Sequence, residues 1–285
     1  MIQNRFWKLN EKRDQMIAFP NAKINLGLSV IEKRPDNYHN LETLFYPVGL
    51  KDVLEVVHNK GGKESYTWNN TGLQIDAPAE ENICIKALDL LKKDHEIGPV
   101  QVHLHKVIPF GAGLGGGSSD GAAMLMLLND LFELNISREK LKKYAAVLGA
   151  DCAFFIDNEP SFAKGIGDEL EAVDIDLRGY YLVLVVPPVH VSTANAYKYV
   201  IPAVPEFRVK EVIKLPVEEW KDKLKNDFEE SVFTGFPELK EMKYYLYDRG
   251  AVYASMSGSG SSLFGLFREK PDIVISNSFV WIEKL

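Results

Sequence analysis

A run of closely spaced glycines between residues 109 and 120 is the clearest chemical signal in the sequence. It reads PFGAGLGGGSSD. In the predicted helix that follows, at residues 121–132, apolar residues lie on nearly every side. Glycines permit positive φ angles and leave backbone N–H groups uncovered, and the helix adds the donors and positive dipole end of its N-terminus. The pattern favours a loop that binds phosphate or another anion.

This loop has two other interpretations. Gly111, Gly113 and Gly116 match the G-x-G-x-x-G of dinucleotide sites, but no acidic residue stands about 20 residues further on to bind a ribose, and no Gly-Lys-Ser/Thr closes a Walker loop. The loop is alternatively a flexible one in which Ser118 or Ser119 caps the helix. A flexible loop rarely needs a buried helix after it, so anion binding remains the favoured interpretation.

Lys23 and Asn25 lie two residues apart on a segment, residues 22–30, in which apolar and polar residues alternate. The alternation predicts a half-buried strand with both polar side chains on one face. A cation beside an amide suits a phosphate or a carboxylate. An ordinary solvated face has the same pattern.

Asp151 comes just after Gly149, which ends a helix predicted from Ser137. An aspartate in this position is commonly a turn or cap residue. The apolar neighbours at residues 152–155 would partly desolvate the carboxylate and raise its basicity, which suits a general base.

Three smaller patterns also involve residues that do chemistry. Tyr38 and His39 in a polar turn are either surface aromatics or a pair that stacks on a base and reads it. Residues 257–262 are Gly/Ser-rich but lie between apolar segments, which favours a tight functional loop over a tether. His103 and His105 share a strand face without an evident third ligand, so no metal site is predicted.

Alternating strands and helices are expected to position these residues. Residues 1–15 lack this patterning and are interpreted as a tail, and a boundary near residue 160 divides an N-terminal domain (16–160) from a C-terminal domain (161–285). The periodicity predicts strands at 22–30, 41–48, 53–57, 100–107 and 181–186, and helices at 81–93, 121–132, 137–148, 217–224 and 237–247.

Composition excludes several classes of protein. The 285 residues include 33 Lys+Arg and 40 Asp+Glu, a net charge of −7, which argues against a general nucleic-acid or anionic-membrane binder. The longest apolar stretch falls well short of the roughly 20 residues of a membrane helix. Cys84 and Cys152 stand in apolar contexts, which argues against disulfides or a metal cluster. We expect a cytoplasmic protein with no nucleic-acid or membrane partner, and the oligomeric state stays open.

Taken together, the motifs resemble those of the GHMP small-molecule kinases, which include galactokinase, homoserine kinase and mevalonate kinase. Within that family, A-K-I-N-L-G-L, N-Y-H, G-L-G-G-G-S-S-D and L-G-A-D-C-A-F-F are most similar to kinases of the non-mevalonate isoprenoid route, which act on a cytidyl diphosphate. The resemblance covers residues 16–267. The three family motifs correspond to residues 22–26, 109–123 and 257–262.

This resemblance implies an α+β fold of two domains with the active site in the cleft between them. It implies ATP as phosphoryl donor, Mg²⁺ with unidentified ligands, and a small cytidyl diphosphate substrate phosphorylated on the 2-hydroxyl of its methylerythritol. Other functions left open are another kinase of this family (mevalonate, homoserine or sugar), a non-catalytic nucleotide or sugar sensor on the same fold, and a dinucleotide-dependent oxidoreductase.

The resemblance also implies roles for individual residues. Asp151 would be the catalytic base and Lys23 its charged partner, while Tyr38 and Tyr197 would sandwich the cytosine and His39 would read its edge. The implied ATP-binding residues are Lys106, Pro109, Gly111, Ala112, Gly113, Leu114, Gly115, Gly116, Gly117, Ser118 and Ser119. The implied substrate-binding residues are Asn25, Tyr38, His39, Thr193, Tyr197, Gly258, Ser259 and Gly260.

Overall fold

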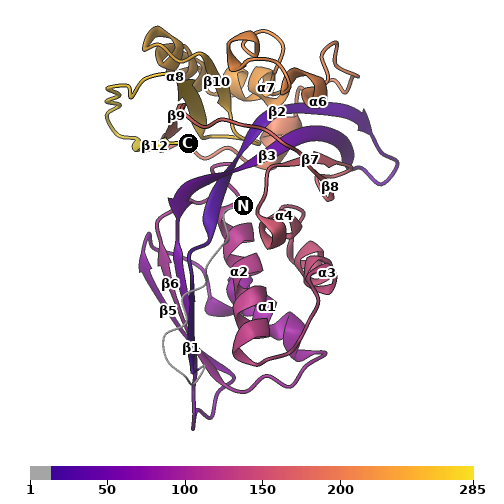
Figure 1. Cartoon of the computed structure of the whole chain (residues 1–285), viewed down its shortest axis with the longest axis vertical. Coiled ribbons are helices and arrows are strands. Elements are labelled where there is room, and N and C mark those ends of the chain that lie inside the picture. Colours follow the sequence, from indigo (N-terminus) through magenta and orange to yellow (C-terminus); the bar gives the residue numbers. More distant parts are fainter. Residues whose placement is uncertain (1–13) are drawn as a thin grey trace. The chain divides into compact units, whose positions relative to one another are not determined.

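Three four-stranded sheets and a set of helices make up the α+β fold in the computed structural model, which describes residues 14–285 (Figure 1). Packing divides these residues into two compact units. The first unit comprises residues 14–22, 50–108 and 115–158, and the second comprises 23–49, 109–114 and 159–285. The predicted division has a single boundary near residue 160, whereas the chain crosses between these units several times because two long strands, β2 and β3, continue from one into the other.

The sheet of the first unit has the strand order β1-β4-β6-β5. β4 pairs antiparallel with both β1 and β6, while β5 runs parallel to β6 on its outer side. Alternate residues of β6, including Val102 and Leu104, are buried, as the alternation in its sequence predicts. The strands are β1 (Gln15–Ala18), β4 (Val53–His58), β5 (Tyr66–Gly72) and β6 (Val100–Lys106).

Helices pack against this sheet, with α2 lying on β1 and β4 (Figure 1). The α2 helix is buried almost all round, as its apolar composition predicts. Asn82 caps α1 by accepting from the Cys84 amide, and Ser137 caps α3 by accepting from the Lys140 amide. The helices are α1 (Ile83–Lys92), α2 (Gly116–Leu131), α3 (Arg138–Leu148) and α4 (Cys152–Asp157), with a 3-10 turn η1 (Ala79–Glu81).

The second unit contains two sheets, with the orders β2-β3-β7-β8 and β10-β11-β9-β12. Helices α7 and α8 pack together, and α8 covers β10 and β11 over a shared apolar core. The strands are β2 (Asn21–Lys33), β3 (His39–Lys51), β7 (Ser161–Lys164), β8 (Glu169–Ala172), β9 (Tyr181–Val186), β10 (Tyr253–Met256), β11 (Leu263–Phe267) and β12 (Phe279–Lys284). The helices are α5 (Thr193–Tyr197), α6 (Val209–Val212), η2 (Val217–Glu219), α7 (Phe228–Gly235) and α8 (Pro237–Asp248).

The predicted strands and most predicted helices are confirmed, with three differences. β2 is buried on both faces rather than half-buried, because its polar face is also covered. The helix predicted at 217–224 is a single 3-10 turn followed by irregular turns. Of the predicted tail, residues 1–13 lie outside the described residues, while Gln15 already pairs with Val57 in β1.

Among residues 14–285, no helix is both long enough and apolar enough to span a bilayer.

Candidate active site

Lys23 is a buried cation in the second unit, with a side chain that is only 3% exposed. Its ammonium donates to Asn25 Oδ1 at 2.6 Å and to the Gly113 carbonyl at 3.1 Å, and it lies 5.0 Å from the centre of the Phe45 ring. A buried charge is tolerated only where polar partners replace water. The predicted neighbours Lys23 and Asn25 are therefore brought together, and the interpretation as a solvated face is wrong.

Asn25 is held in one orientation by partners on both sides of its amide. Its Nδ2 donates to Thr43 Oγ1 at 2.9 Å, and Thr43 in turn donates to the Gly27 carbonyl at 2.5 Å. The backbone N–H of Asn25 donates to Ser257 Oγ at 3.2 Å. The amide oxygen of Asn25 is thus aimed at the Lys23 ammonium.

Residues 257–262 form a tight loop between the paired strands β10 and β11, as expected, and not a tether. Ser257 N–H donates to the Ser262 carbonyl at 2.9 Å, and Ser257 Oγ donates to the Gly113 carbonyl at 3.0 Å. Ser262 donates to the Ala112 carbonyl through both its amide (3.2 Å) and its hydroxyl (2.5 Å). These bonds join two loops of the second unit, residues 109–114 and 257–262.

Two glycines of the 109–114 segment are required by close packing. Gly113 has φ +78°, and a Cβ on it would overlap the carbonyl oxygen of Ser257. Gly111 has φ +60°, and its Cβ would lie 3.0 Å from Cε1 of His190. A side chain at Gly113 would force the two loops apart, and one at Gly111 would displace the His190 ring.

The rest of the glycine run begins α2 in the first unit. Gly115, with φ +68°, is the N-cap residue and provides no side-chain cap, so the helix starts at Gly116. Ser118 and Ser119 lie inside its first turn, and the prediction that either caps the helix is wrong. The first amides of a helix have no acceptor within it, and they carry the positive end of the helix dipole. A Cβ on Gly117 would meet open space, which leaves room for an anion there.

Asp151 stands at the N-cap position of α4 in the first unit, half-buried, and its side chain does not cap that helix. Burial raises the pKa of the adjacent Cys152 to about 11; the charge of Asp151 acts in the same direction, and a hydrogen bond with Ser118 opposes it. Cys152 and Ser118 therefore connect the start of α4 to the first turn of α2. Lys23 belongs to the other unit, so the pairing of Lys23 with Asp151 stays a prediction.

Lys106 is buried and makes ion pairs with two carboxylates, and its predicted role in binding the nucleotide stays a prediction. Its ammonium contacts Asp52 and lies 2.9 Å from Asp120 Oδ2, and all three side chains are at most 2% exposed. Burial lowers the pKa of Lys106, but the two carboxylates outweigh burial and raise it overall. A Cβ on Gly116 would lie 3.0 Å from this ammonium, so Lys106 supports the start of α2 from inside the unit.

The two carboxylates beside Lys106 differ in their surroundings. Asp52 Oδ1 accepts from the amides of Val107 (2.6 Å) and Ile108 (2.9 Å), whereas Asp120 Oδ1 is buried without a hydrogen-bond partner. Burial raises the pKa of Asp120 to about 8, with the Lys106 charge opposing it and the Asp52 charge adding to it. Burial therefore favours the protonated form of Asp120 beside the Lys106 ammonium.

The residues predicted to bind the cytosine are partly assembled in the second unit. The His39 ring stacks on the Tyr197 ring, with centroids 4.6 Å apart and planes 23° apart, and Phe228 meets Tyr197 edge to face at 4.7 Å. Tyr38 is 60% exposed, and Thr193 is exposed at the start of α5, a helix that the sequence analysis did not predict. Burial, together with the charge of Lys33, lowers the pKa of His39 and favours a neutral ring.

The two strand histidines share a neutral partner. Thr71 Oγ1 lies 2.9 Å from Nε2 of His103 and 3.0 Å from Nδ1 of His105. Among residues 14–285, no three His, Cys, Asp or Glu side chains are grouped as metal ligands.

Sequence analysis missed three partners that hold the predicted residues. Thr43 orients Asn25, while Asp52 and Asp120 hold Lys106. Asp120 ends the glycine motif and was visible there, but an aspartate at a helix start is usually a dipole or cap residue. Asp52 separates two predicted strands, where a charged turn residue is ordinary, so its sequence context carried no signal.

Family models match both halves of the sequence. The model described as "GHMP kinases N terminal domain" matches residues 82–159, and "GHMP kinases C terminal" matches residues 205–277. A 4-diphosphocytidyl-2-C-methyl-D-erythritol kinase of Parabacteroides distasonis is 53% identical, over 93% of this chain and 98% of the relative. The kinase of the same name from Bacteroides fragilis is 54% identical over 90% of this chain and 94% of the relative.

Solved structures give the same picture of the fold. A crystal structure of 4-(cytidine 5'-diphospho)-2C-methyl-D-erythritol kinase is similar with a TM-score of 0.75 and 34% identity, covering 88% of this chain and 90% of the other. Homoserine kinase from Cytophaga hutchinsonii superposes with a TM-score of 0.71 over 99% and 98% of the two chains, at 17% identity. The second likeness concerns the fold alone.

Gly113→Ala is expected to destabilise the protein, because Ala disfavours φ +78° and its methyl group would displace the Ser257 carbonyl. A loss of at least about 2 kcal/mol corresponds to a melting temperature lower by at least about 4 °C. Gly117→Ala is the matched control, since its methyl group meets open space in a helical turn. Differential scanning calorimetry should give this control a melting temperature at or above that of the wild type; equal melting temperatures for Gly113→Ala and the wild type would contradict the analysis.

The free energy of unfolding is expected to fall as pH rises from about 5 to about 8. Asp120 has a pKa of about 8 in the folded state and about 4 when unfolded, so the native state binds the extra proton in this window. Each pH unit there contributes up to about 1.4 kcal/mol, and the stabilisation is lost above the folded-state pKa.

Urea unfolding of the wild type and of Asp120→Asn at several pH values measures this effect. Between about pH 5 and about pH 8, the free energy of unfolding of the variant should fall by at least about 1 kcal/mol less than that of the wild type. Asp89→Asn, an exposed change on α1, is the control and should keep the wild-type pH dependence. Parallel pH profiles for wild type and Asp120→Asn would show that Asp120 does not hold the proton.

Proposed function

The chain belongs to the GHMP kinases, and we infer that it transfers the γ-phosphoryl group of ATP to the 2-hydroxyl of 4-diphosphocytidyl-2-C-methyl-D-erythritol. The observation that carries this inference is an identity of 53% and 54%, over 93% and 90% of this chain, with two kinases of that name. Family membership sets aside the dinucleotide-dependent oxidoreductase. The high identity with these kinases also makes this chain a phosphotransferase of isoprenoid precursor synthesis.

Kinases of this family use ATP with a divalent metal, and the start of α2 fits a triphosphate. Gly115 leaves the helix end without a side-chain cap, and a Cβ on Gly117 would meet open space beside the first turn. Ser118 offers a hydroxyl oxygen of the kind that Mg²⁺ accepts alongside phosphate oxygens. When bound, Mg·ATP supplies the phosphoryl group, and the metal neutralises part of the charge that develops on it.

We propose that Asp151 accepts the proton of the acceptor hydroxyl. Its half-buried position at the start of α4 and the buried residues that follow it support this role. In phosphoryl transfer the protein mainly positions the groups and stabilises charge, so the base acts on an oxygen that is already in line.

We propose that the Lys23 ammonium stabilises the charge of the moving phosphoryl group. The ammonium is oriented in advance by Asn25 and by the Gly113 carbonyl, so it needs little reorganisation during the reaction. Asn25 would place the acceptor beside it. These two roles for Lys23 and Asp151 are proposed for one reaction although the residues belong to different units.

We propose that Tyr38, His39 and Tyr197 bind the cytosine. His39 covers one face of the Tyr197 ring, so a cytosine between Tyr38 and Tyr197 would take the place of His39 on that face. A neutral His39 can then donate its N–H to cytosine N3. Uracil presents a donor at this position, and the site would reject it.

Asp151→Asn is expected to lower kcat by at least about a hundredfold, the usual contribution of a general base, with little change in the KM for Mg·ATP. A coupled ADP-release assay with the cytidyl substrate measures both constants. Asp157→Asn is the control, because Asp157 ends the same helix and pairs with Arg138 and Lys142. Near-wild-type turnover by Asp151→Asn would remove Asp151 from proton transfer.

The acceptor preference can be tested with one panel of substrates in the same assay. The cytidyl erythritol substrate should be phosphorylated, while mevalonate, homoserine and galactose should not. The uridine analogue should have a kcat/KM lower by at least about a hundredfold, because it would leave buried donors facing each other. Equal constants for cytidine and uridine would exclude base reading by His39, and ligand binding without ADP release would indicate a sensor.

A further inference from the structure

Asn226 is a buried amide that holds the 257–262 loop in the second unit. Its side chain is 3% exposed, and its Nδ2 donates to the carbonyls of Met256 (2.8 Å) and Gly258 (2.9 Å). Its Oδ1 accepts from the Phe228 amide at 3.0 Å, which fixes which way the amide faces. Both N–H groups of the Asn226 side chain therefore donate to carbonyls at the start of the 257–262 loop.

Residues next to Asn226 in the sequence are hydrogen-bonded to β2. Asp227 Oδ2 accepts from the Val30 amide of β2 at 2.7 Å, and Leu28 exchanges backbone hydrogen bonds with Lys225 and Asp227. The segment 225–229 is thus fastened to the strand that carries Lys23 and Asn25.

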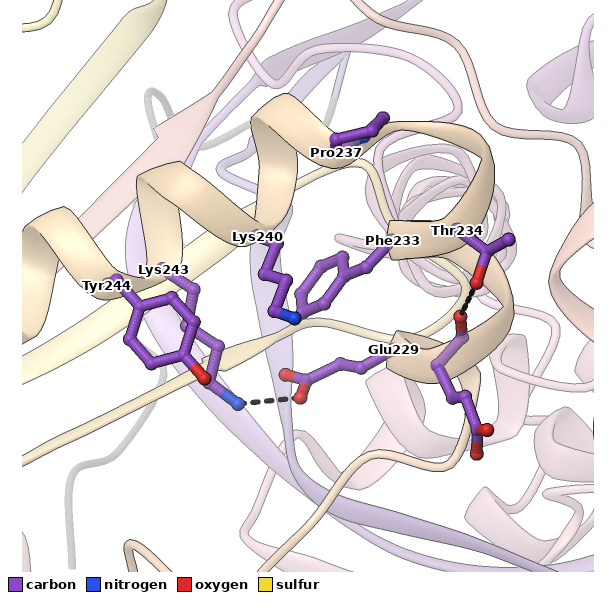
Figure 2. A pocket seen from close by; sticks show the side chains of 8 residues that line it. Glu229, Phe233, Thr234, Pro237, Lys240, Lys243 and Tyr244 are labelled. Carbon is purple, nitrogen blue, oxygen red and sulfur yellow. Dashed lines mark hydrogen bonds and ion pairs between the residues drawn. The ribbon is translucent and has the colours of Figure 1, made fainter.

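Glu229 also holds the end of β10, just before the 257–262 loop. One of its carboxylate oxygens accepts from the Met256 amide (2.9 Å) and from Ser255 Oγ (3.1 Å). The other oxygen pairs with Lys243 of α8 at 2.6 Å, and Figure 2 shows the two side chains pointing toward each other across a pocket between α7 and α8. β10 therefore reaches the loop in a position set by α7 and α8.

The loop that Asn226 holds has little freedom to adjust. Gly258 has φ +55°, and a Cβ on it would lie 3.3 Å from Asn25 Oδ1. Ser257 bonds both the Asn25 amide and the Gly113 carbonyl. A small shift of the loop would change the surroundings of Asn25 and of the Lys23 ammonium.

We propose that Asn226 is a positioning residue that sets the 257–262 loop for binding of the phosphoryl acceptor. The inference rests on the proposed function, since it assumes that Gly258, Ser259 and Gly260 contact this substrate. Asn226 acts through the loop and does not itself touch the acceptor. Its loss affects acceptor binding more than binding of Mg·ATP.

Asn226→Asp tests this role because it keeps the acceptor oxygen and replaces both donors by an oxygen that faces two carbonyls. The KM for the cytidyl acceptor should rise by at least about tenfold, because tenfold corresponds to about one hydrogen bond and the variant loses two, while the KM for Mg·ATP stays within about twofold. Asn226→Ala removes the donors without adding charge and should show the same split, and it serves where the Asp variant folds poorly.

Asn129→Asp is the matched control. Asn129 also clamps a loop with its amide, by accepting from the Ile136 N–H at 2.9 Å and donating to the Ile136 carbonyl at 3.3 Å, but it lies on α2 in the first unit. This variant should lower the melting temperature and leave the acceptor KM unchanged. A variant that is merely unstable would behave as this control does.

Hydrogen exchange on the wild-type protein gives a readout that does not depend on variant folding. The cytidyl acceptor should slow exchange in residues 255–262 and in residues 226–229 together. Protection of the loop without protection of 226–229, or an unchanged acceptor KM in folded Asn226 variants, would overturn the positioning role. Failure of the wild type itself to phosphorylate the acceptor would instead refute the proposed function.

Discussion

A buried ammonium must find oxygen partners, and the second unit is organised around this requirement at Lys23. The Gly113 carbonyl accepts from both Lys23 Nζ and Ser257 Oγ, so one backbone oxygen joins the strand motif, the glycine run and the 257–262 loop. Asn25 supplies the other oxygen and is itself held by Thr43. Because each group has its hydrogen bonds satisfied by the next, none can move without exposing an unpaired polar atom to an apolar interior.

In the first unit, the buried ammonium of Lys106 has carboxylates as partners instead of neutral oxygens. Here two carboxylates approach one ammonium, which would leave an excess negative charge in the interior if both were ionised. Two backbone amides donate to Asp52, while Asp120 has one oxygen paired with Lys106 and the other without a hydrogen-bond partner, and burial raises the pKa of Asp120. The triad lies against the start of α2 and supports it from inside the unit.

Local signals predicted much of the fold. Alternation identified β2 and β6, Ser137 and Gly149 identified the ends of α3, and the apolar circumference identified α2 as buried. These features depend on neighbours within a few residues, whose backbone geometry repeats along the chain. The start of α2 was misjudged, because the left-handed conformation of Gly115 allows a helix to begin without a side-chain cap.

The sequence by itself determined which residues could do chemistry: Lys23 with Asn25, the glycine run, Asp151, and His39 with its neighbours. Only the tertiary structure decided what each of them touches. Lys23 meets Gly113 90 residues away and Asn25 meets Ser257 232 residues away, and these partners bury a strand face that alternation alone marked as solvated. The family resemblance implied that Lys106 helps to bind the nucleotide, and the structure shows that Asp52 and Asp120 are its ion-pair partners. Periodicity reports that a residue is polar, but whether that polar group meets water, a ligand or another buried group depends on segments that are distant in sequence and close only after folding.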